Sequence, residues 1–219
     1  MVTVAHIVEK ILKGRPFLEE AISYGIVNYT ALALMIKREV EKEMGREVRH
    51  AAIMMAIRRL GEKLESGDLG RAPIKFEGSD MTIKSDLFET TIMRSNSAED
   101  AIARLYKIVD FGKGGFLTVT QGLYEITIIS NRQYITKFKD VLRNEHTVKS
   151  IDSIASLSIR IPIDAIETVG YFYVITKALG WNDINIVEIV STLTELTFIL
   201  DQKNVMRAFS AIEALMKGK

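Results

Sequence analysis

The sequence contains no cysteine, one tryptophan and very little net charge. Without cysteine, the chain can form neither disulfides nor thiolate metal or redox sites. A formal net charge of +1 gives no overall field that would attract a polyanion. The longest nearly apolar run, from Val169 to Trp181, includes Lys177 and is shorter than the ~20 residues that cross a bilayer. With no secretory signal pattern at its start, the chain is predicted to be cytoplasmic and to have no membrane contact.

The sequence also offers no arrangement of catalytic side chains. His6, His50 and His146 stand apart, without the spacing of a metal site or a catalytic triad, and a solvated or capping role is expected for each. The glycine-rich run at 112–115 lacks the Gly-Lys-Ser/Thr ending of a phosphate-binding loop. We therefore predict that the chain is not an enzyme, and we predict no cofactor, catalytic residue or metal ligand.

Hydrophobic residues make up 47% of the chain, which is ordinary for a globular protein. A length of 219 residues suits two or three small domains better than one large domain. Pro16 suits the first turn of a helix, Asn28 or Thr30 is a candidate N-cap, and Gly45 is a candidate C-cap. Apolar residues at helical spacing predict four helices, at residues 2–13, 17–24, about 28–45 and 49–65.

Two of these helices, joined by a short turn that contains Gly45, form a helix-turn-helix pattern. The stretch from Tyr29 to Leu60 resembles winged-helix DNA-binding domains, and Ile74–Glu77 with Met81–Lys84 would supply the wing hairpin. In such domains, outward side chains of the second helix contact phosphates and base edges. The matching side chains here are Arg49, His50, Arg58, Arg59 and Lys63. DNA is therefore one candidate partner.

The same helices also suit a protein-docking domain. Residues 1–72 hold 12 Lys and Arg against 10 Asp and Glu, and the resulting net charge of +2 is weak for a DNA-binding domain. Met54 and Met55 are expected to point partly outward, which suits a protein interface better than a DNA groove. Both interpretations remain open at this stage: DNA binding, and dimerisation or partner docking.

From Leu87 onward the chain repeats itself. Shifted by 70 positions, residues 125–129 fall on residues 195–199. The same shift aligns the apolar pairs Leu87/Leu157, Leu105/Ile175, Leu117/Val187, Val119/Ile189 and Leu123/Leu193. A constant offset over this length indicates two copies of one structural unit.

Each copy reads strand, helix, strand, strand, helix, which predicts an α+β fold with helices covering one face of a sheet. The first copy has a closing strand at residues 148–154, whereas the second copy has no such strand after its last helix. The second sheet should therefore have three strands or be completed by another segment or another chain. The predicted domains are a helical domain at 1–72, a wing or linker at 73–86, and the two copies at 87–154 and 155–219.

The stretch from Ala155 to Leu200 carries a family resemblance. Residues 178–186, ALGWNDINI, resemble the helix-to-strand passage of ACT domains, and Gly170 falls where that family places the glycine that opens its first helix. The second copy is also similar to the regulatory tail of aspartate kinases. The resemblance implies two ferredoxin-like (βαββαβ) ACT domains, an amino acid as small-molecule ligand, and a homodimer or higher homo-oligomer.

In ACT domains the ligand sits by the loop between the first strand and the first helix, at a seam between two domains. The resemblance implies these ligand-binding positions: Ile163, Asp164, Glu167, Thr168, Val169, Gly170, Tyr171, Asn185 and Ile186. Backbone N–H groups at the helix N-terminus would bind the ligand carboxylate, and Asp164 or Glu167 would pair with its ammonium. The alternative is that Gly170 only lets the helix approach the sheet.

The corresponding loop of the first copy, Ser95-Asn96-Ser97-Ala98, contains no glycine. Ser97 and Asp100 form the pattern of a capping box. The first copy is therefore expected to be structural, with one ligand site per chain in the second copy.

These observations together predict an amino-acid-sensing regulatory protein whose natural output is transcription. Two alternatives stay open. The first is a non-DNA regulatory subunit that docks onto an amino-acid biosynthetic enzyme. The second is a structural oligomer whose ligand site has decayed.

Overall fold

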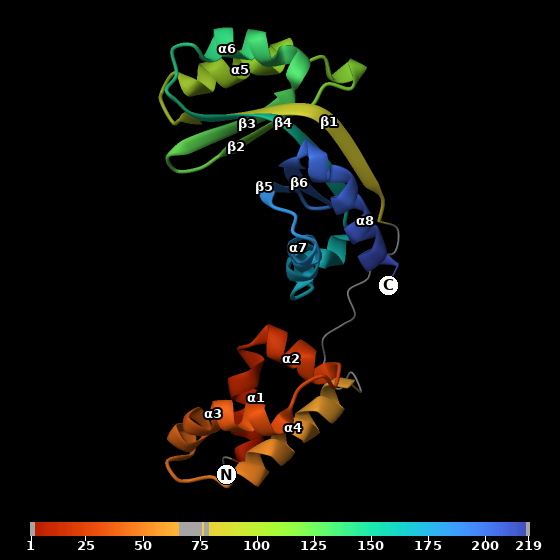
Figure 1. The fold of residues 1–219 in the computed structure, drawn as a ribbon. Helices are drawn as coiled ribbons and strands as arrows, with labels where there is room; N and C mark the ends of the chain where they lie inside the picture. The colour runs from red at the N-terminus through yellow and green to blue at the C-terminus, as the bar shows by residue number, and fades with distance from the viewer. Residues whose placement is uncertain (1–2, 66–75, 77–78, 218–219) are drawn as a thin grey trace. The chain divides into compact units, whose positions relative to one another are not determined.

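The computed structural model describes residues 3–65, 76 and 79–217. The chain divides into two compact units, Met1–Ala72 and Pro73–Lys219. The first unit is helical and the second combines helices with one sheet (Figure 1).

The first unit holds the four helices expected from the apolar spacing. The side chain of Asn28 accepts a hydrogen bond from the Ala31 N–H at 3.1 Å and so caps the third helix, and Gly45, with φ of 64°, ends it. The inward faces of the four helices form one buried core that includes Ile7, Ile36 and Ile57. The helices are α1 (Val4–Lys13), α2 (Pro16–Ser23), α3 (Tyr29–Met44) and α4 (His50–Glu65).

The structure describes the second strand predicted for the wing hairpin and only Phe76 of the first. Residues 74, 75 and 77 of its first strand lie outside the described residues. Met81–Lys84, its second strand, begins the long strand β1 (Met81–Met93) and pairs with the strand that contains Ser156 and Ile159. The wing assignment is therefore wrong for Met81–Lys84, which belong to the sheet of the second unit.

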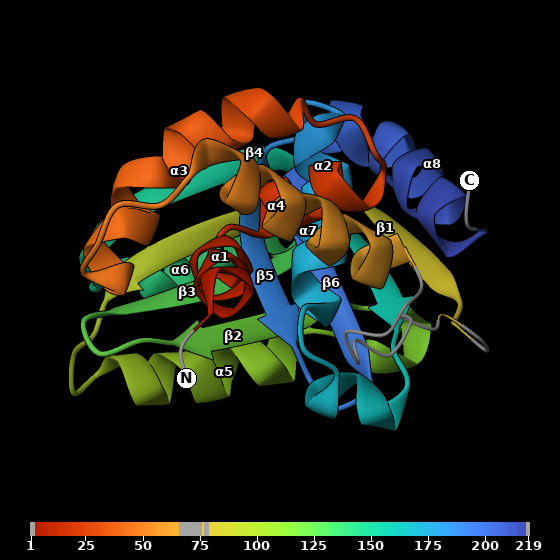
Figure 2. The same ribbon diagram turned by 90° about the horizontal axis from the view of Figure 1, so that it is seen from below.

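The second unit is built on a single antiparallel sheet of six strands in the order β2-β3-β1-β4-β6-β5. Besides β1, its strands are β2 (Leu117–Gln121), β3 (Glu125–Asn131), β4 (Thr147–Arg160), β5 (Ile186–Ser191) and β6 (Glu195–Asp201). Both views show β1 as one long, curved strand (Figures 1 and 2).

The two long strands, β1 and β4, are shared by two similar halves of this sheet. The later part of β1 pairs with the early part of β4, as in Thr90 opposite Ser150, whereas Ile83 near the start of β1 pairs with Leu157 near the end of β4. The missing fourth strand of the second copy is therefore Met81–Lys84, another segment of the same chain. The boundary expected between residues 154 and 155 falls inside the continuous strand β4.

Both shared strands carry an irregularity where the halves meet. Asp86 in β1 has φ of 57° and Ser153 in β4 has φ of 61°, a left-handed conformation that is uncommon outside glycine. The pairing of β1 with β4 shifts register between Lys84 and Leu87. Such a register shift inserts one extra residue into a strand. The side chains beyond it then face the opposite side of the sheet from the one that strict alternation would give. Ile83 and Phe88 therefore both face helices, although five positions separate them.

Four helices cover one face of the sheet. Helices α5 (Ala98–Ile108) and α6 (Ile135–Leu142) lie side by side over the first half (Figure 1), and α7 (Tyr171–Trp181) and α8 (Val205–Met216) cover the second half. The first core includes an edge-to-face contact of Phe88 and Phe138 with ring centroids 5.5 Å apart. The opposite, helix-free face carries the buried side chains of Leu87, Ile129, Ile154 and Ile199.

The 70-residue offset holds for part of the repeat only. The hairpins follow it, since Val119 pairs with Ile128 and Ile189 pairs with Phe198. The first strands instead differ by 67 positions, because Met93 faces Glu125 whereas Arg160 faces Glu195. The segment between the first strand and the hairpin is thus three residues longer in the second half. The Gly170 loop is longer than its counterpart, with ten residues between Arg160 and Tyr171 against four between Met93 and Ala98, whereas the connection from helix to hairpin is shorter.

Candidate functional site

The Gly170 loop connects β4 to α7. Residues Ile163–Glu167 form a short 3-10 helix, and Gly170, with φ of 89°, directly precedes α7. A Cβ atom at Gly170 would meet no atom within 4 Å, so the glycine is required by its backbone conformation and not by a close approach to the sheet. Val169 is 88% exposed and Ile163 is 68% exposed.

The side chain of Tyr171 packs in the core of the second half. This side chain is buried, with its ring centroid 5.5 Å from that of Phe76. Burial raises the pKa of the Tyr171 phenol, a nearby Ser79 hydroxyl opposes this shift, and Asp164 adds to it. The side chain of Tyr171 therefore serves packing, and its backbone N–H donates to the Thr168 carbonyl in the loop at 3.2 Å.

Asn185 and Ile186 lie at the far end of the second half from the Gly170 loop. Ile186 pairs with Leu200, whereas the loop starts beside Thr194, whose carbonyl accepts a hydrogen bond from the Ile161 N–H at 2.9 Å. Six residues of strand separate Thr194 from Leu200, which is about 20 Å. Within one chain, Asn185 and Ile186 are therefore not brought together with the other predicted ligand residues.

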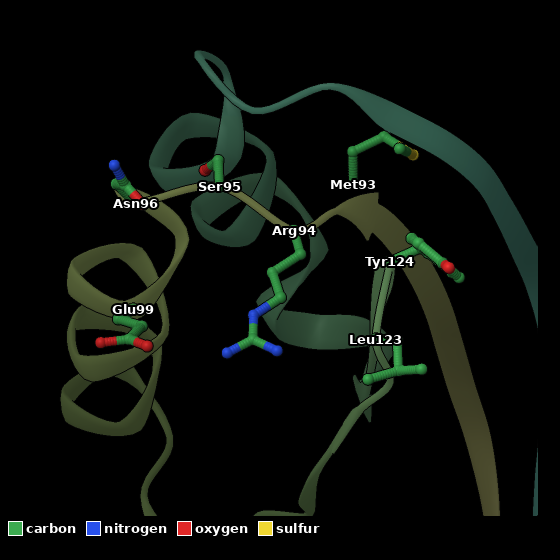
Figure 3. Close-up of a pocket in the computed structure, with 7 residues that line it drawn as sticks. All are labelled: Met93, Arg94, Ser95, Asn96, Glu99, Leu123 and Tyr124. Atoms are coloured by element: carbon green, nitrogen blue, oxygen red, sulfur yellow. The ribbon is translucent and has the colours of Figure 1, made fainter.

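The corresponding loop of the first half borders a cavity of about 430 Å³. Figure 3 shows the loop that follows β1, the start of α5 and the tip of the β2–β3 hairpin around it. The Arg94 N–H donates to the Tyr124 carbonyl at 2.8 Å and so ties loop to hairpin. The lining residues are Met93, Arg94, Ser95, Asn96, Glu99, Leu123 and Tyr124.

A small hydrogen-bond network fixes the shape of this loop. The Ser95 hydroxyl accepts from the Ala98 N–H at 3.1 Å and contacts Glu145 Oε2 at 2.6 Å. Hydrogen bonds from Ser95 and then Ser97 lower the pKa of the Glu145 carboxyl. Ser97 makes no side-chain capping bond, so the predicted capping box of Ser97 and Asp100 is wrong and Ser95 is the residue that caps α5.

The cavity combines opposite charges with apolar walls. Arg94 and Glu99 are exposed, and the Arg94 guanidinium lies between the helix that carries Glu99 and the hairpin that carries Leu123 (Figure 3). Leu123 is 81% exposed and Tyr124 is 76% exposed. A guanidinium can bind a carboxylate through two parallel hydrogen bonds, a nearby carboxylate can bind an ammonium, and exposed apolar side chains can hold a hydrocarbon group.

Sequence reasoning missed this cavity. The absence of a glycine in the Ser95–Ala98 loop suggested a purely structural role, although a short loop beside an exposed hairpin tip also leaves a hollow. The available signal was the pair of exposed apolar residues Leu123 and Tyr124, next to a loop with Arg94 and Glu99 of opposite charge.

The candidate DNA-contacting residues of α4 differ in their surroundings. Arg49, Arg58, Arg59 and Lys63 are exposed. Arg58 Nε lies 3.3 Å from Glu62 Oε1 in an ion pair. Both ring nitrogens of the half-buried His50 are enclosed, and within the described residues neither has a hydrogen-bond partner. His50 therefore does not present its ring nitrogens to the surface as a groove-reading residue would.

Across 3–65, 76 and 79–217, no group of three or more His, Asp and Glu side chains is placed to hold a metal ion. Within the same residues, no helix is long and apolar enough to cross a membrane.

The sheet and the helices that cover it have a fold that is also found in solved aspartate kinase regulatory subunits. The structure is similar to aspartokinase alpha and beta subunits, at 11% sequence identity and a TM-score of 0.51 over 64% of this chain and 97% of that chain. It is also similar to the regulatory subunit of aspartate kinase from Thermus flavus, at 12% identity and a TM-score of 0.50 over 61% of this chain and 94% of that chain.

A third similar structure is the aspartate kinase of Clostridium acetobutylicum, at 13% identity and a TM-score of 0.51, with 64% of this chain and 35% of that chain covered. At these identities the similarity shows the fold alone. No protein-family model matches the sequence, and no curated protein matches it. These likenesses lend no support to a winged-helix domain or to transcriptional regulation.

Proposed function

We propose that this chain is a regulatory protein that senses an amino acid through its ACT-like unit. The observation that carries the proposal is the cavity between β1 and α5, where Arg94 and Glu99 place opposite charges beside apolar side chains. Solved structures of the same fold are regulatory subunits of aspartate kinase. Their match to this chain concerns the fold, so the ligand is inferred from the chemistry of the cavity.

The charge arrangement suits a free amino acid. Arg94 would bind the α-carboxylate, Glu99 would bind the α-ammonium, and Leu123 and Tyr124 would contact the side chain. The Gly170 loop is the second proposed position, because Asp164 and Glu167 flank an exposed loop at a helix N-terminus. Binding at either loop would favour one arrangement of the surrounding elements, with a coupling free energy of typically ~1–3 kcal/mol.

Thermal unfolding in the presence of each of the twenty amino acids tests this proposal. A ligand at 100 times its dissociation constant should stabilise the protein by ~2.7 kcal/mol. Arg94→Met should abolish this stabilisation, whereas Arg104→Met, a change at an exposed arginine of α5 outside the cavity, should retain it. If no amino acid raises the melting temperature, sensing is wrong; if Arg94→Met still responds fully, the site lies elsewhere.

For the output, we propose that the helical unit docks onto a protein partner. Leu34, Met35 and Met55 are 62%, 55% and 42% exposed on α3 and α4. These helices meet nearby, where the Thr30 hydroxyl lies 3.7 Å from Met54 Sδ. Large exposed apolar side chains mark interaction surfaces, and this favours a regulatory subunit that acts on an amino-acid biosynthetic enzyme.

DNA binding is the second candidate output, favoured by the exposed side chains of Arg49 and Arg59. Gel-shift experiments at physiological salt separate the two outputs. A docking protein should show no sequence-dependent DNA binding, whereas a DNA-binding protein should show binding that Arg49→Ala and Arg59→Ala weaken.

A homodimer is part of this proposal. Within the described residues, β2 and β5 each pair with only one strand, and unpaired strand edges are sites where chains associate. Sedimentation equilibrium should give twice the chain mass of 24.6 kDa; a monomer at all concentrations would contradict the dimer without affecting the ligand proposal.

A further inference from the structure

A second cavity, of about 360 Å³, lies on the helix-free face of the sheet. We propose that it binds a small ligand whose carboxylate and ammonium groups are separated by a short hydrocarbon spacer. The cavity forms where β1, β4 and β6 of the second half meet Phe116, which belongs to the first half. The proposal is independent of amino-acid sensing at the loop cavity, because the two cavities share no lining residue.

The register of the strands places the lining side chains on the helix-free face. Ala155, Leu157 and Ile159 of β4 pack in the helix-covered core. Because side chains alternate along a strand, Ser156 and Ser158 face the other way.

The neighbouring strand brings its polar residues to the same rows. Thr82 of β1 lies opposite Ser158, and Lys84 lies opposite Ser156. The Arg160 N–H donates to the Asp80 carbonyl at 2.9 Å. Two of these rows, Thr82 with Ser158 and Asp80 with Arg160, line the cavity, and Lys84 lines it from the third row.

The end at Lys84 suits a carboxylate. Lys84 is half-buried, its Nζ donates to the Gly114 carbonyl at 2.9 Å, and it lies 5.7 Å from the centroid of the Phe116 ring. An ammonium carries three donors, so two remain for a ligand. A ligand carboxylate in the cavity would accept hydrogen bonds from these remaining donors.

The other end of the cavity suits an ammonium. Arg160 faces Glu195 on β6 and neighbours Asp80 on β1. The Glu195 carboxylate accepts from the Thr197 hydroxyl at 3.1 Å. Two carboxylates beside one guanidinium give this end a net negative charge, so a simple dianion would be repelled and a cationic group attracted.

The spacing of the two ends sets the length of the ligand. Lys84 and Asp80 are four residues apart, and their Cα atoms are therefore about 13 Å apart along the strand. The side chains of Lys84 and Asp80 occupy part of this length, so it is an upper bound, and a carboxylate and an ammonium separated by no more than about five methylene groups fit between the two ends. Phe116 supplies an apolar contact for the spacer. Because Phe116 comes from the first half, the ligand would contact both halves of the sheet.

Calorimetric titration of the full chain with 6-aminohexanoate tests this inference. We expect saturable 1:1 binding that is at least tenfold stronger than that of hexanoate or hexylamine, each of which lacks one charged group. Lys84→Met and Glu195→Gln should each weaken binding at least tenfold. Lys149→Met, a change at an exposed lysine of β4 that does not line the cavity, should leave binding unchanged.

Three outcomes would overturn the inference. The first is that millimolar 6-aminohexanoate does not bind, and the second is that hexanoate binds equally well. The third is that Arg94→Met loses binding, which would place the probe in the cavity beside Arg94. The melting temperatures of Lys84→Met and Glu195→Gln without ligand are the folding control. Values within a few degrees of that of the parent protein show that both variants are folded. A response to amino acids that Arg94→Met abolishes supports the sensing proposal whether or not 6-aminohexanoate binds.

Discussion

Glu89 is a carboxyl group that the sheet encloses almost completely. It is 7% exposed, and its Oε2 has no hydrogen-bond partner within the described residues. Burial raises the pKa of Glu89, the neighbouring Glu188 raises it further, and Lys149 opposes the shift. A raised pKa in the folded state means that folding favours the protonated form.

The pH dependence of stability follows from this shift. Glu89 stabilises the fold fully below its unfolded pKa of about 4.3, and this contribution is lost as the pH rises through the folded pKa. Glu89→Gln should therefore be more stable than the parent protein at pH 7, with the difference shrinking toward pH 4. Melting temperatures between pH 4 and 8 measure this difference, and Glu125→Gln, at an exposed position, is the control. If the melting temperatures of the parent protein and Glu89→Gln run parallel across this range, the pKa of Glu89 is not raised.

Gly170 is the second residue whose role can be isolated. Because its φ is 89° and the space around it is open, Gly170→Val should cost roughly 1–2 kcal/mol through backbone conformation alone. Gly180→Ala, within α7 and likewise facing open space, should instead stabilise the protein by roughly 0.5–1 kcal/mol. Urea unfolding measures both. If the Gly170 loop binds the amino acid, Gly170→Val also removes the ligand-induced rise in melting temperature.

At the scale of elements, the junction of the two halves depends on left-handed residues in the shared strands. Ser153→Val places a β-branched side chain at φ of 61°, and we expect a loss of about 1–3 kcal/mol. Asp152→Val, at the adjacent exposed position of β4, should change stability by no more than about 0.5 kcal/mol. Equal losses for the two variants in urea unfolding would show that the conformation of Ser153 carries no special cost.

At the scale of the molecule, the continuous sheet predicts that its two halves unfold together. Ile92→Ala in the first core and Ile175→Ala in the second core remove fully buried side chains, and each should cost about 2–5 kcal/mol. Both should lower the same calorimetric transition. Ile36→Ala, in the core of the helical unit, should lower a different transition. Separate transitions for Ile92→Ala and Ile175→Ala would mean that β1 and β4 do not couple the halves.

The helices and strands could be predicted because their signals are local. The spacing of Ile7, Val8 and Leu12 defines α1, and the mainly apolar segment from Leu196 to Leu200 defines β6, without reference to the rest of the chain. Pairing is not local. Met81–Lys84 has the same pattern whether it pairs with a wing strand or with β4, and nothing nearby in sequence indicates a partner at Ser156–Ile159.

The candidate site was predictable in kind but not in position. The sequence indicated a loop between first strand and first helix, and both halves have one. It could not show that Tyr171 turns into the core, because that depends on packing against Phe76. Nor could it show that Asn185 lies at the far end of the strands. The cavity beside Arg94 arises from a short loop and a protruding hairpin, neither of which has a motif.

The shared strand also sets an order of events during synthesis. Met81 pairs with Ile159, and at ~5–20 residues per second the start of β1 waits about 4–16 s for its partner. An unpaired strand can recruit another chain. Charged residues in or beside such a strand act as gatekeepers against aggregation. Asp80 directly precedes β1, and Lys84 and Asp86 lie within it. Two of them, Asp80 and Lys84, line the cavity of the finished sheet, so we expect that neutralising them would lower the soluble yield during expression as well as weaken the cavity.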